Sequence, residues 1–298
     1  MRISQNLQPT LRMAYRAAYN RYLQQAPSLT SEIYMQDSID TLVSEDYWLG
    51  DVPGIEEWLT ARTYQELAQF DKKITSKPYT TRGWRYNRIQ RAGPNIAQLT
   101  SRMSRTINVC SWYPDKACID LLNKGSTELA YDGQPFFSAA GREYNNTYTY
   151  TGNTLATLTA DLSGIIKQMA TFSTDTGLAI EMTPDVILCG MDTYINLKTL
   201  LNSNTFAVLE NPSTANPFSE FGLRVIWSPY VPAETYYVMS TRLGMKPLFW
   251  QTTTVEGRNI TLDIDDTHVA SEGWYGIAAS IYGAADFGFP FTCIKVSK

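Results

Sequence analysis

The sequence predicts an α+β fold, and three observations support this prediction. Residues 95–123 carry one apolar stripe at helical spacing, which predicts a long helix that must pack along that stripe. Residues 126–244 alternate between helical and strand patterns, which predicts helices packed on a central sheet. Beyond Pro247 the pattern is almost wholly that of strands. These late strands have no companion helix in sequence, so we expect the helix over 95–123 to pack on them and to join the two ends of the chain.

The composition favours a protein that uses its surface for contacts. With 298 residues the chain can form one large domain or two modest ones. Charged residues are only 18% and aromatic residues 12%, and tyrosine-rich surface poor in charge is typical of interfaces. The net charge of -4 argues against a protein whose main task is to grip nucleic acid. The N-terminus has no apolar signal region, and no apolar run approaches the roughly 18 residues of a membrane span, so we expect an intracellular protein without a membrane partner.

Charge is segregated along the first third of the chain. Residues 1–29 contain four arginines and no acid, residues 30–60 contain eight acids and no lysine or arginine, and residues 61–106 contain ten basic residues against two acids. Adjacent blocks of opposite sign favour pairing, and between copies such pairing sets register and orientation. We therefore expect a subunit interface in this region. Its candidate residues are Glu45, Asp46, Glu56, Glu57, Lys72, Lys73, Lys77, Arg82, Trp84, Arg85 and Arg88.

The N-terminal elements are expected to be extended. Residues 9–25 have the spacing of a short amphipathic helix, which Pro27 ends. Residues 61–93 are predicted to form a long hairpin, with a turn at Asp71-Lys72-Lys73. A two-stranded ribbon is marginally stable in water, so it must lie against something else. We expect the first hundred or so residues to find most of their stabilising contacts on other copies of the chain. A rival use of the basic hairpin is nucleic-acid binding, with Trp84 stacking on bases between Arg82, Arg85 and Arg88.

The central elements follow from periodicity and from turn residues. Pro114-Asp115 should break or kink the long helix, and Gly125 should end it. A further helix begins at Leu155, and another spans Met191–Leu201. Strands are predicted at 184–189, 223–227, 236–239, 248–254, 260–264, 274–282 and 291–296. Between helix and sheet, the loop Tyr131–Ser138 is expected either to bury Phe136 and Phe137 near a domain junction or to be an internal core loop.

The sequence contains no catalytic constellation that we recognise. It lacks the phosphate-binding, dinucleotide, zinc-protease and nucleophile-elbow motifs, and a single histidine removes the commonest general base. The four cysteines have no Cys-x-x-Cys spacing and are expected to be buried free thiols. Asp263, Asp265 and His268 form the one cluster that could hold a cation or act as a carboxylate hydrolase, although an acidic turn between strands is the simpler interpretation. We expect no enzyme activity, no cofactor and no metal.

Several short segments resemble the Mu-like phage major head subunit family, which comprises tailed-phage capsid proteins of the Hong Kong type fold. The resemblance runs in order from about residue 47 to the C-terminus, and its most specific piece runs from Tyr131 to Phe137. The matching residues are Trp48, Gly50 and Pro53; Glu57-Trp58; Pro114-Asp115 before Leu121-Leu122; Tyr131, Asp132, Gly133, Gln134, Pro135, Phe136 and Phe137; Gly177-Leu178 before Pro184-Asp185; Asn216-Pro217; and Pro247-Leu248-Phe249.

The resemblance implies a structural subunit in four parts. These are an N-terminal arm (1–46), an extended hairpin loop (47–93), a peripheral domain with a long spine helix (94–125 and 245–298) and an axial domain around a central sheet (126–244). Hexamers and pentamers of such subunits would tile an icosahedral head that encloses double-stranded DNA bound non-specifically. Scaffold, protease and portal proteins are the implied partners, and assembly in the bacterial host cytoplasm is the implied location.

Overall fold

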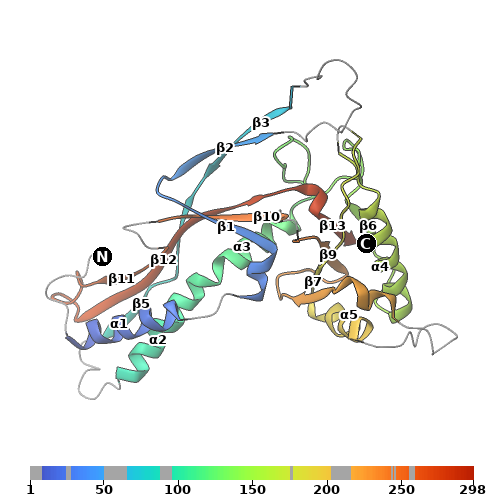
Figure 1. The fold of residues 1–298 in the computed structure, drawn as a ribbon. Coiled ribbons are helices and arrows are strands. Elements are labelled where there is room, and N and C mark those ends of the chain that lie inside the picture. The colour runs from blue at the N-terminus through green and yellow to red at the C-terminus, as the bar shows by residue number, and fades with distance from the viewer. Residues whose placement is uncertain are drawn as a thin grey trace.

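The computed structural model describes residues 9–24, 28–49, 66–87, 96–174, 177–202, 216–242, 244, 246–254 and 259–298. Within these residues the chain folds around two sheets of different construction, connected by a helical rod (Figure 1). We call the two halves the six-stranded unit and the five-stranded unit, after their sheets.

The six-stranded unit has β12 (Trp274–Phe287) at its centre. Along one edge β12 pairs antiparallel with β10 (Leu248–Thr253) and then with β11 (Ile260–Asp265). Along its other edge β12 pairs antiparallel with β4 (Lys77–Thr80) and β5 (Trp84–Asn87). The strand β1 (Tyr34–Ile39) adds to β10 in parallel. The late strands predicted from the sequence therefore form, but early strands complete their sheet.

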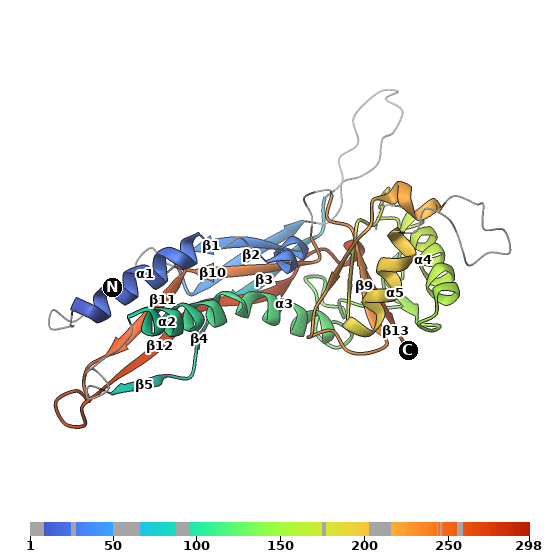
Figure 2. The same ribbon diagram turned by 90° about the horizontal axis from the view of Figure 1, so that it is seen from below.

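Three helices cover one face of this sheet. The rod consists of α2 (Ile96–Ser111) and α3 (Tyr113–Asn123), and it packs on β12, with α2 also on β11 and α3 on β10. The predicted packing of the long helix on the late strands is thus confirmed. The break falls at Trp112, and α3 restarts at once because Pro114 lies in its first turn, where a missing N–H costs no hydrogen bond. Figure 2 shows α2 and α3 running in line from the six-stranded unit toward the five-stranded unit.

The N-terminal helix α1 (Pro9–Leu23) packs on α2 of the same chain. Its apolar side chains Leu11, Ala14, Tyr15 and Ala18 are buried in the core that also contains Leu99, Met103 and Ile107 of α2. After the short helix η1 (Leu29–Ile33) the chain enters β1. The expectation that the first hundred residues find most of their stabilising contacts on other copies is therefore wrong for α1, β1, β4 and β5. The apolar stripes of α1 and α2 complement each other, so this helix pair buries both without a neighbour.

The five-stranded unit is buried on both faces of its sheet. The strand order is β6-β13-β9-β7-β8, in which β13–β9 and β9–β7 are antiparallel and the other two pairs are parallel. On one face, α4 (Leu155–Ala170) and α5 (Met191–Asn202) pack against alternate strand residues such as Ile187 and Val238. On the other, Leu188 and Tyr237 belong to the core that α3 shares with the six-stranded unit. The strands are β6 (Thr147–Thr149), β7 (Val186–Cys189), β8 (Arg224–Trp227), β9 (Thr235–Met239) and β13 (Cys293–Ser297).

The last strand joins the two units. After β12 ends at Phe287, the helix η4 (Pro290–Thr292) turns the chain, and β13 pairs with β9 and β6 in the five-stranded sheet. Within the part of the chain that the structure describes, no helix has both the length and the apolar character needed to cross a membrane.

Candidate assembly surfaces and the junction between the units

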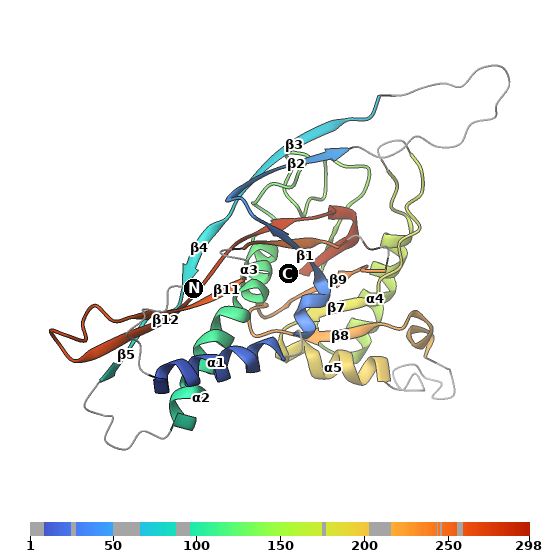
Figure 3. The ribbon, with the colours of Figure 1, turned by 60° about the vertical axis from the view of Figure 1, so that its left-hand side comes forward.

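The hairpin that projects from the body is made of β2 (Val43–Leu49) and β3 (Gln69–Thr75), paired antiparallel (Figure 3). The predicted turn at residues 71–73 is wrong, because β3 passes straight through them. In this register Glu45 lies opposite Lys73, and Asp46 lies opposite Lys72. Opposite charges across an antiparallel pair stabilise it, which explains why two adjacent lysines form a strand here. Two members of each charge block therefore face each other within one chain.

The root of the hairpin is fastened to the six-stranded sheet by polar contacts. Lys72 Nζ donates to Asp286 Oδ1 at 2.5 Å, and both side chains are largely buried. The Gln251 amide nitrogen donates to Ser44 Oγ at 2.7 Å from β10, where Gln251 is only 1% exposed. Lys72 is therefore committed to its own chain, whereas its neighbour Lys73 is exposed.

An aromatic cluster fixes the direction in which the hairpin leaves the body. The Trp48 ring of β2 stacks on Tyr131 with ring centroids 4.8 Å apart and planes 6° apart. Phe70 of β3 meets the same Tyr131 ring edge-on at 5.6 Å. Phe289 lies 5.0 Å from Trp48. Both strands thus contact the loop that follows Ala130. The contact between Trp48 and Tyr131 also joins two residues that carry the family resemblance.

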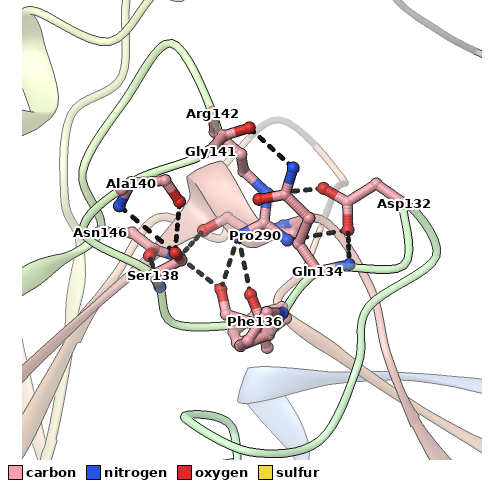
Figure 4. Close-up of polar contacts among 10 residues, drawn as sticks. Asp132, Gln134, Phe136, Ser138, Ala140, Gly141, Arg142, Asn146 and Pro290 are labelled. Carbon is pink, nitrogen blue, oxygen red and sulfur yellow. Dashed lines mark hydrogen bonds and ion pairs between the residues drawn. The ribbon is translucent and has the colours of Figure 1, made fainter.

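That loop, residues 131–146, is held by a network around Arg142 and Asn146 (Figure 4). Arg142 Nε and Nη2 donate to the two carboxylate oxygens of Asp132 at 2.6 and 2.9 Å. Arg142 Nη1 also donates to the carbonyls of Pro135 and Phe136. Gly133 has φ +75°, which suits glycine at the tip of this turn. Because the guanidinium donates to carboxylate and backbone together, Arg142 ties the start of the loop to the backbone beside the two phenylalanines.

Asn146 ties the same loop to the end of the chain. Its amide nitrogen donates to the carbonyl of Phe136 at 2.7 Å and to that of Pro290 at 3.1 Å. Its amide oxygen accepts from the backbone N–H of Ser138 at 2.8 Å. Asn146 is fully buried, so each of these bonds satisfies a group that water cannot reach.

The two phenylalanines lie between the units. Phe136 is 0% exposed and stacks on Phe287, the last residue of β12, at 4.3 Å. Phe137 stacks on Tyr237 of β9 at 5.7 Å. Gly125 permits this approach, since a Cβ there would lie 2.7 Å from the Phe137 ring. Of the two expectations for this loop, burial near a junction describes the contacts.

A second set of contacts bridges the units on the N-terminal side. Arg224 of β8 pairs with Glu32 of η1 at 2.6 Å. Lys246 Nζ donates to the Tyr34 carbonyl at 3.0 Å, and burial lowers the pKa of this lysine. The Tyr34 hydroxyl donates to Asp115 of α3 at 2.7 Å. Burial, and then the nearby Asp115 carboxylate, raise the pKa of Tyr34 well above its usual value.

The remaining candidate interface residues are spread over the molecule. Trp84 does not present its ring for stacking on a base, because its Nε1 donates to Thr106 of α2 at 3.0 Å and the ring packs against the core. Arg85 lies over the Trp274 ring at 4.5 Å. Lys77 and Arg82 are exposed. Gly50, Pro53, Glu56, Glu57, Trp58 and Arg88 lie outside the described residues.

The acidic cluster between β11 and β12 is an ordinary turn. Asp265 accepts from the backbone and hydroxyl of Thr267, and these bonds lower the pKa of its carboxyl. Asp263 accepts from Ser280, and His268 stacks on Trp274 beside Glu272. Across the described ranges, no group of three histidine, cysteine or acidic side chains could hold a metal ion. The four cysteines are buried and free, as expected.

The structure reveals contacts that sequence reasoning did not find. Arg142, Asn146, Gln251 and Asp286 were not among the candidate residues. Asp132 and Arg142 lie ten residues apart in a stretch without periodicity, and Lys72 and Asp286 are separated by 214 residues. The one available signal was that Asp286 follows an apolar strand pattern, where an acid needs a partner.

Comparison with known proteins agrees with this architecture. The family model described as "Mu-like prophage major head subunit gpT" matches residues 8–155. The match thus begins earlier than residue 47, where the resembling segments begin, and it ends before the later of those segments. The major capsid protein of Escherichia phage Mu is 30% identical over 138 residues, which are 46% of this chain and 44% of that protein. The chain spans about half the length of the curated relatives that it matches.

Solved capsid structures share the fold over nearly the whole chain. The procapsid of bacteriophage JBD30 matches with a TM-score of 0.55 and 19% identity, over 99% of this chain and 76% of that chain. The mature capsid of bacteriophage PhiM1 matches with a TM-score of 0.60 and 12% identity, over 92% of this chain and 87% of that chain. The rod, the hairpin and the two sheets are therefore those of the tailed-phage capsid fold, and residues 8–155 are similar to the Mu-like prophage major head subunit gpT family.

Proposed function

We propose that this chain is the major capsid protein of a tailed phage or of a Mu-like prophage. Many copies would assemble as hexamers and pentamers into an icosahedral head, and the assembled head would enclose double-stranded DNA. The observation that carries the proposal is the fold itself, since 99% of the chain aligns with a subunit of the JBD30 procapsid.

The hairpin supports this proposal because its position suits a contact between copies. β2 and β3 run along the outside of the molecule, at the upper margin of the view in Figure 3. Lys72 and Trp48 are used within the chain, whereas Glu45 and Lys73, which lie opposite each other nearer the start of β2, are exposed. Glu45 and Lys73 are therefore the described charges of the hairpin that we propose for neighbour contacts, together with Lys77, Arg82 and Arg85.

The edge strand β8 of the five-stranded sheet supports the proposed capsid function as well. β8 is an edge strand, and unpaired edges in stable proteins are usually covered. Large apolar side chains are exposed on β8, on the loop after it and on the helix α5 that packs against it. They are Met191 (52%), Ile195 (64%), Trp227 (46%) and Tyr230 (41%). Contacts between copies would remove this surface from water, and closed symmetry would repeat each contact around the shell.

The division into parts remains a proposal. We assign residues 1–46 to an arm, 47–93 to a hairpin loop, 94–125 and 245–298 to a peripheral domain and 126–244 to an axial domain. Non-specific contact with packaged DNA, and partnership with scaffold, protease and portal proteins, follow from the proposed role. Assembly in the bacterial host cytoplasm and residence in the virion capsid follow in the same way.

Electron microscopy and sedimentation test the proposal directly. The purified chain, alone and coexpressed with a head scaffold, should yield closed particles with pentameric and hexameric units. Trp227→Asp should reduce particle yield at unchanged subunit stability, because it places a charge on the proposed sheet-edge contact. Leu178→Asp, at a loop residue that is 45% exposed, is the matched control and should leave the yield unchanged. A chain that stays monomeric under all these conditions would contradict the proposal.

A further inference from the structure

The outer faces of α1 and α2 form a surface that carries only positive charge. On α1 the arginines Arg16 and Arg21 are exposed and lie outside the buried stripe of this helix. On α2, Arg102 and Arg105 are exposed in the same way. Neither helix contains an aspartate or a glutamate. Since α1 packs on α2, the two helices that carry these arginines form one layer (Figure 3).

These four cations are not neutralised by the part of the chain that the structure describes. None of them forms an ion pair with a carboxylate among those residues. The carboxylates of the adjoining elements η1 and α3 already have partners. Glu32 pairs with Arg224, Asp115 accepts from Tyr34, and Asp120 pairs with Lys116.

The acids of the sheet lie on its opposite face. Along β11 the core residues Leu262 and Ile264 alternate with the exposed residues Asp263 and Asp265. Successive side chains of a strand point to opposite faces, so the two aspartates project away from α2. The cationic layer is therefore separated from the acids of this unit by the thickness of the sheet.

The chain as a whole carries a net charge of -4, so this layer reflects segregation rather than an excess of positive charge. Such a layer needs an anionic partner. Double-stranded DNA presents one negative charge per roughly 1.7 Å of its axis, and guanidinium groups match phosphate geometry.

We propose that the α1–α2 face, through Arg16, Arg21, Arg102 and Arg105, contacts the phosphates of double-stranded DNA without reading its sequence. This inference rests on the proposed capsid function and adds to it which surface faces the enclosed DNA. Trp84 is held against α2 by its bond to Thr106, so the ring that was predicted to stack on bases does not accompany these arginines. Contacts that are confined to phosphates position a nucleic acid without selecting its base sequence.

The test compares two double variants of the full-length chain. Arg102→Gln/Arg105→Gln removes two charges from the proposed face, and Arg16→Gln/Arg21→Gln removes the other two. The matched control, Lys167→Gln/Lys198→Gln, removes two exposed charges from α4 and α5. Binding of unassembled chain to a labelled 30-base-pair duplex is followed by fluorescence anisotropy between 50 and 200 mM salt, with two unrelated duplex sequences. Circular dichroism establishes that each variant is folded.

Each arginine pair should lower the slope of log K against log salt by about 1.8, since each phosphate contact contributes about 0.9. The loss should be the same for both duplexes, and the lysine control should keep the wild-type slope. An unchanged slope in both arginine variants, an equal loss in the control, or no binding by the wild-type chain would each overturn the inference.

Particle formation is scored separately by electron microscopy. Normal particles from a variant with a lowered slope would support the inference. Particles from a wild-type chain that does not bind DNA would overturn the inference and leave the capsid function standing. Loss of particles with an unchanged slope would assign the face to a contact between copies and would also overturn it. Failure of the wild-type chain to form particles, with the arginine-dependent slope intact, would count against the capsid function alone.

Discussion

The two units of this subunit bury their sheets differently. In the five-stranded unit, β7 and β9 are buried at every residue, because α4 and α5 cover one face and α3 with Phe137 covers the other. In the six-stranded unit, β11 and most of β12 alternate between buried and more exposed residues, because helices cover one face only. The difference teaches that the central strands of the five-stranded sheet are covered on both faces by their own chain, whereas the six-stranded sheet leaves one face partly exposed along β11 and β12.

The junction between the units belongs to neither half alone. Phe136 and Phe137 come from one loop, yet Phe136 packs on the end of β12 and Phe137 packs on β9. The aromatic cluster at Trp48 attaches the hairpin to this same loop. The position of the hairpin relative to both sheets is therefore set by residues 131–146. The following predictions test how far the two units and the hairpin depend on one another.

The largest effect is expected from Phe136→Ala. This side chain is fully buried between the units, so its loss should reduce the free energy of unfolding by about 4 kcal/mol. Urea unfolding of unassembled chain measures the loss, and hydrogen exchange should show weaker protection in both β9 and β12. Trp227→Ala, at a side chain that is 46% exposed, should cost less than about 1 kcal/mol. Loss of protection in only one unit would show that the units fold independently at this point.

Arg142→Ala should have the next largest effect and reduce the free energy of unfolding by about 3 kcal/mol. The substitution leaves the nearly buried Asp132 carboxylate and two backbone carbonyls without their hydrogen-bond donor. The matched change is Lys116→Ala, which breaks a pair with Asp120 whose side chains are 44% and 41% exposed. That change should cost less than about 1 kcal/mol, because water screens exposed ion pairs. Equal losses in urea unfolding would contradict the assigned role of Arg142 in the junction.

A smaller and more local effect is expected from Lys72→Ala. Loss of the bond to Asp286 should cost about 2 kcal/mol and should loosen the hairpin rather than the sheets. Faster hydrogen exchange in β3, with unchanged exchange in β9, is the expected pattern. Lys73→Ala alters the neighbouring exposed lysine and serves as the control, with an expected cost below about 0.5 kcal/mol. If Lys73→Ala loosens β3 as much, the contact with Asp286 does not anchor the hairpin.

The smallest expected effect concerns the reactivity of the cysteine thiols, which are found in both units. Burial raises the pKa of Cys110 on α2 to about 11 and that of Cys189 on β7 to about 12. A raised pKa means that thiolate forms only as the pH approaches these values, so little of it exists at pH 8. The folded chain should therefore react slowly with a disulfide reagent at pH 8, and all four thiols should react in denaturant. Fast reaction at one site of the folded chain would reveal that its unit opens first.

Some helices and strands could be predicted from their own sequence pattern, without knowledge of the elements that they pack against. The stripes of α1, α2 and α4 repeat every three or four residues, so their helices could be located from the sequence. The late strands could be located as well, because apolar and β-branched residues mark them. Pro114 was read correctly as marking an interruption, although α3 already begins at Tyr113 because the first turn of a helix accepts proline.

The sequence by itself determined the fold class, the free buried cysteines and the positions of most helices and late strands, since each depends on a local or compositional signal. Only the tertiary structure decided the partner of β3, the attachment of α1 to its own chain, and the ion pairs of Arg142 and Lys72. From the sequence alone, Lys72 and Lys73 are typical of a polar turn, and only their pairing with β2 shows that they belong to a strand. Asp286, the partner of Lys72, lies 214 residues away from it in the sequence. Such contacts form between residues that only the folded chain brings together, so the periodicity of the sequence does not indicate them.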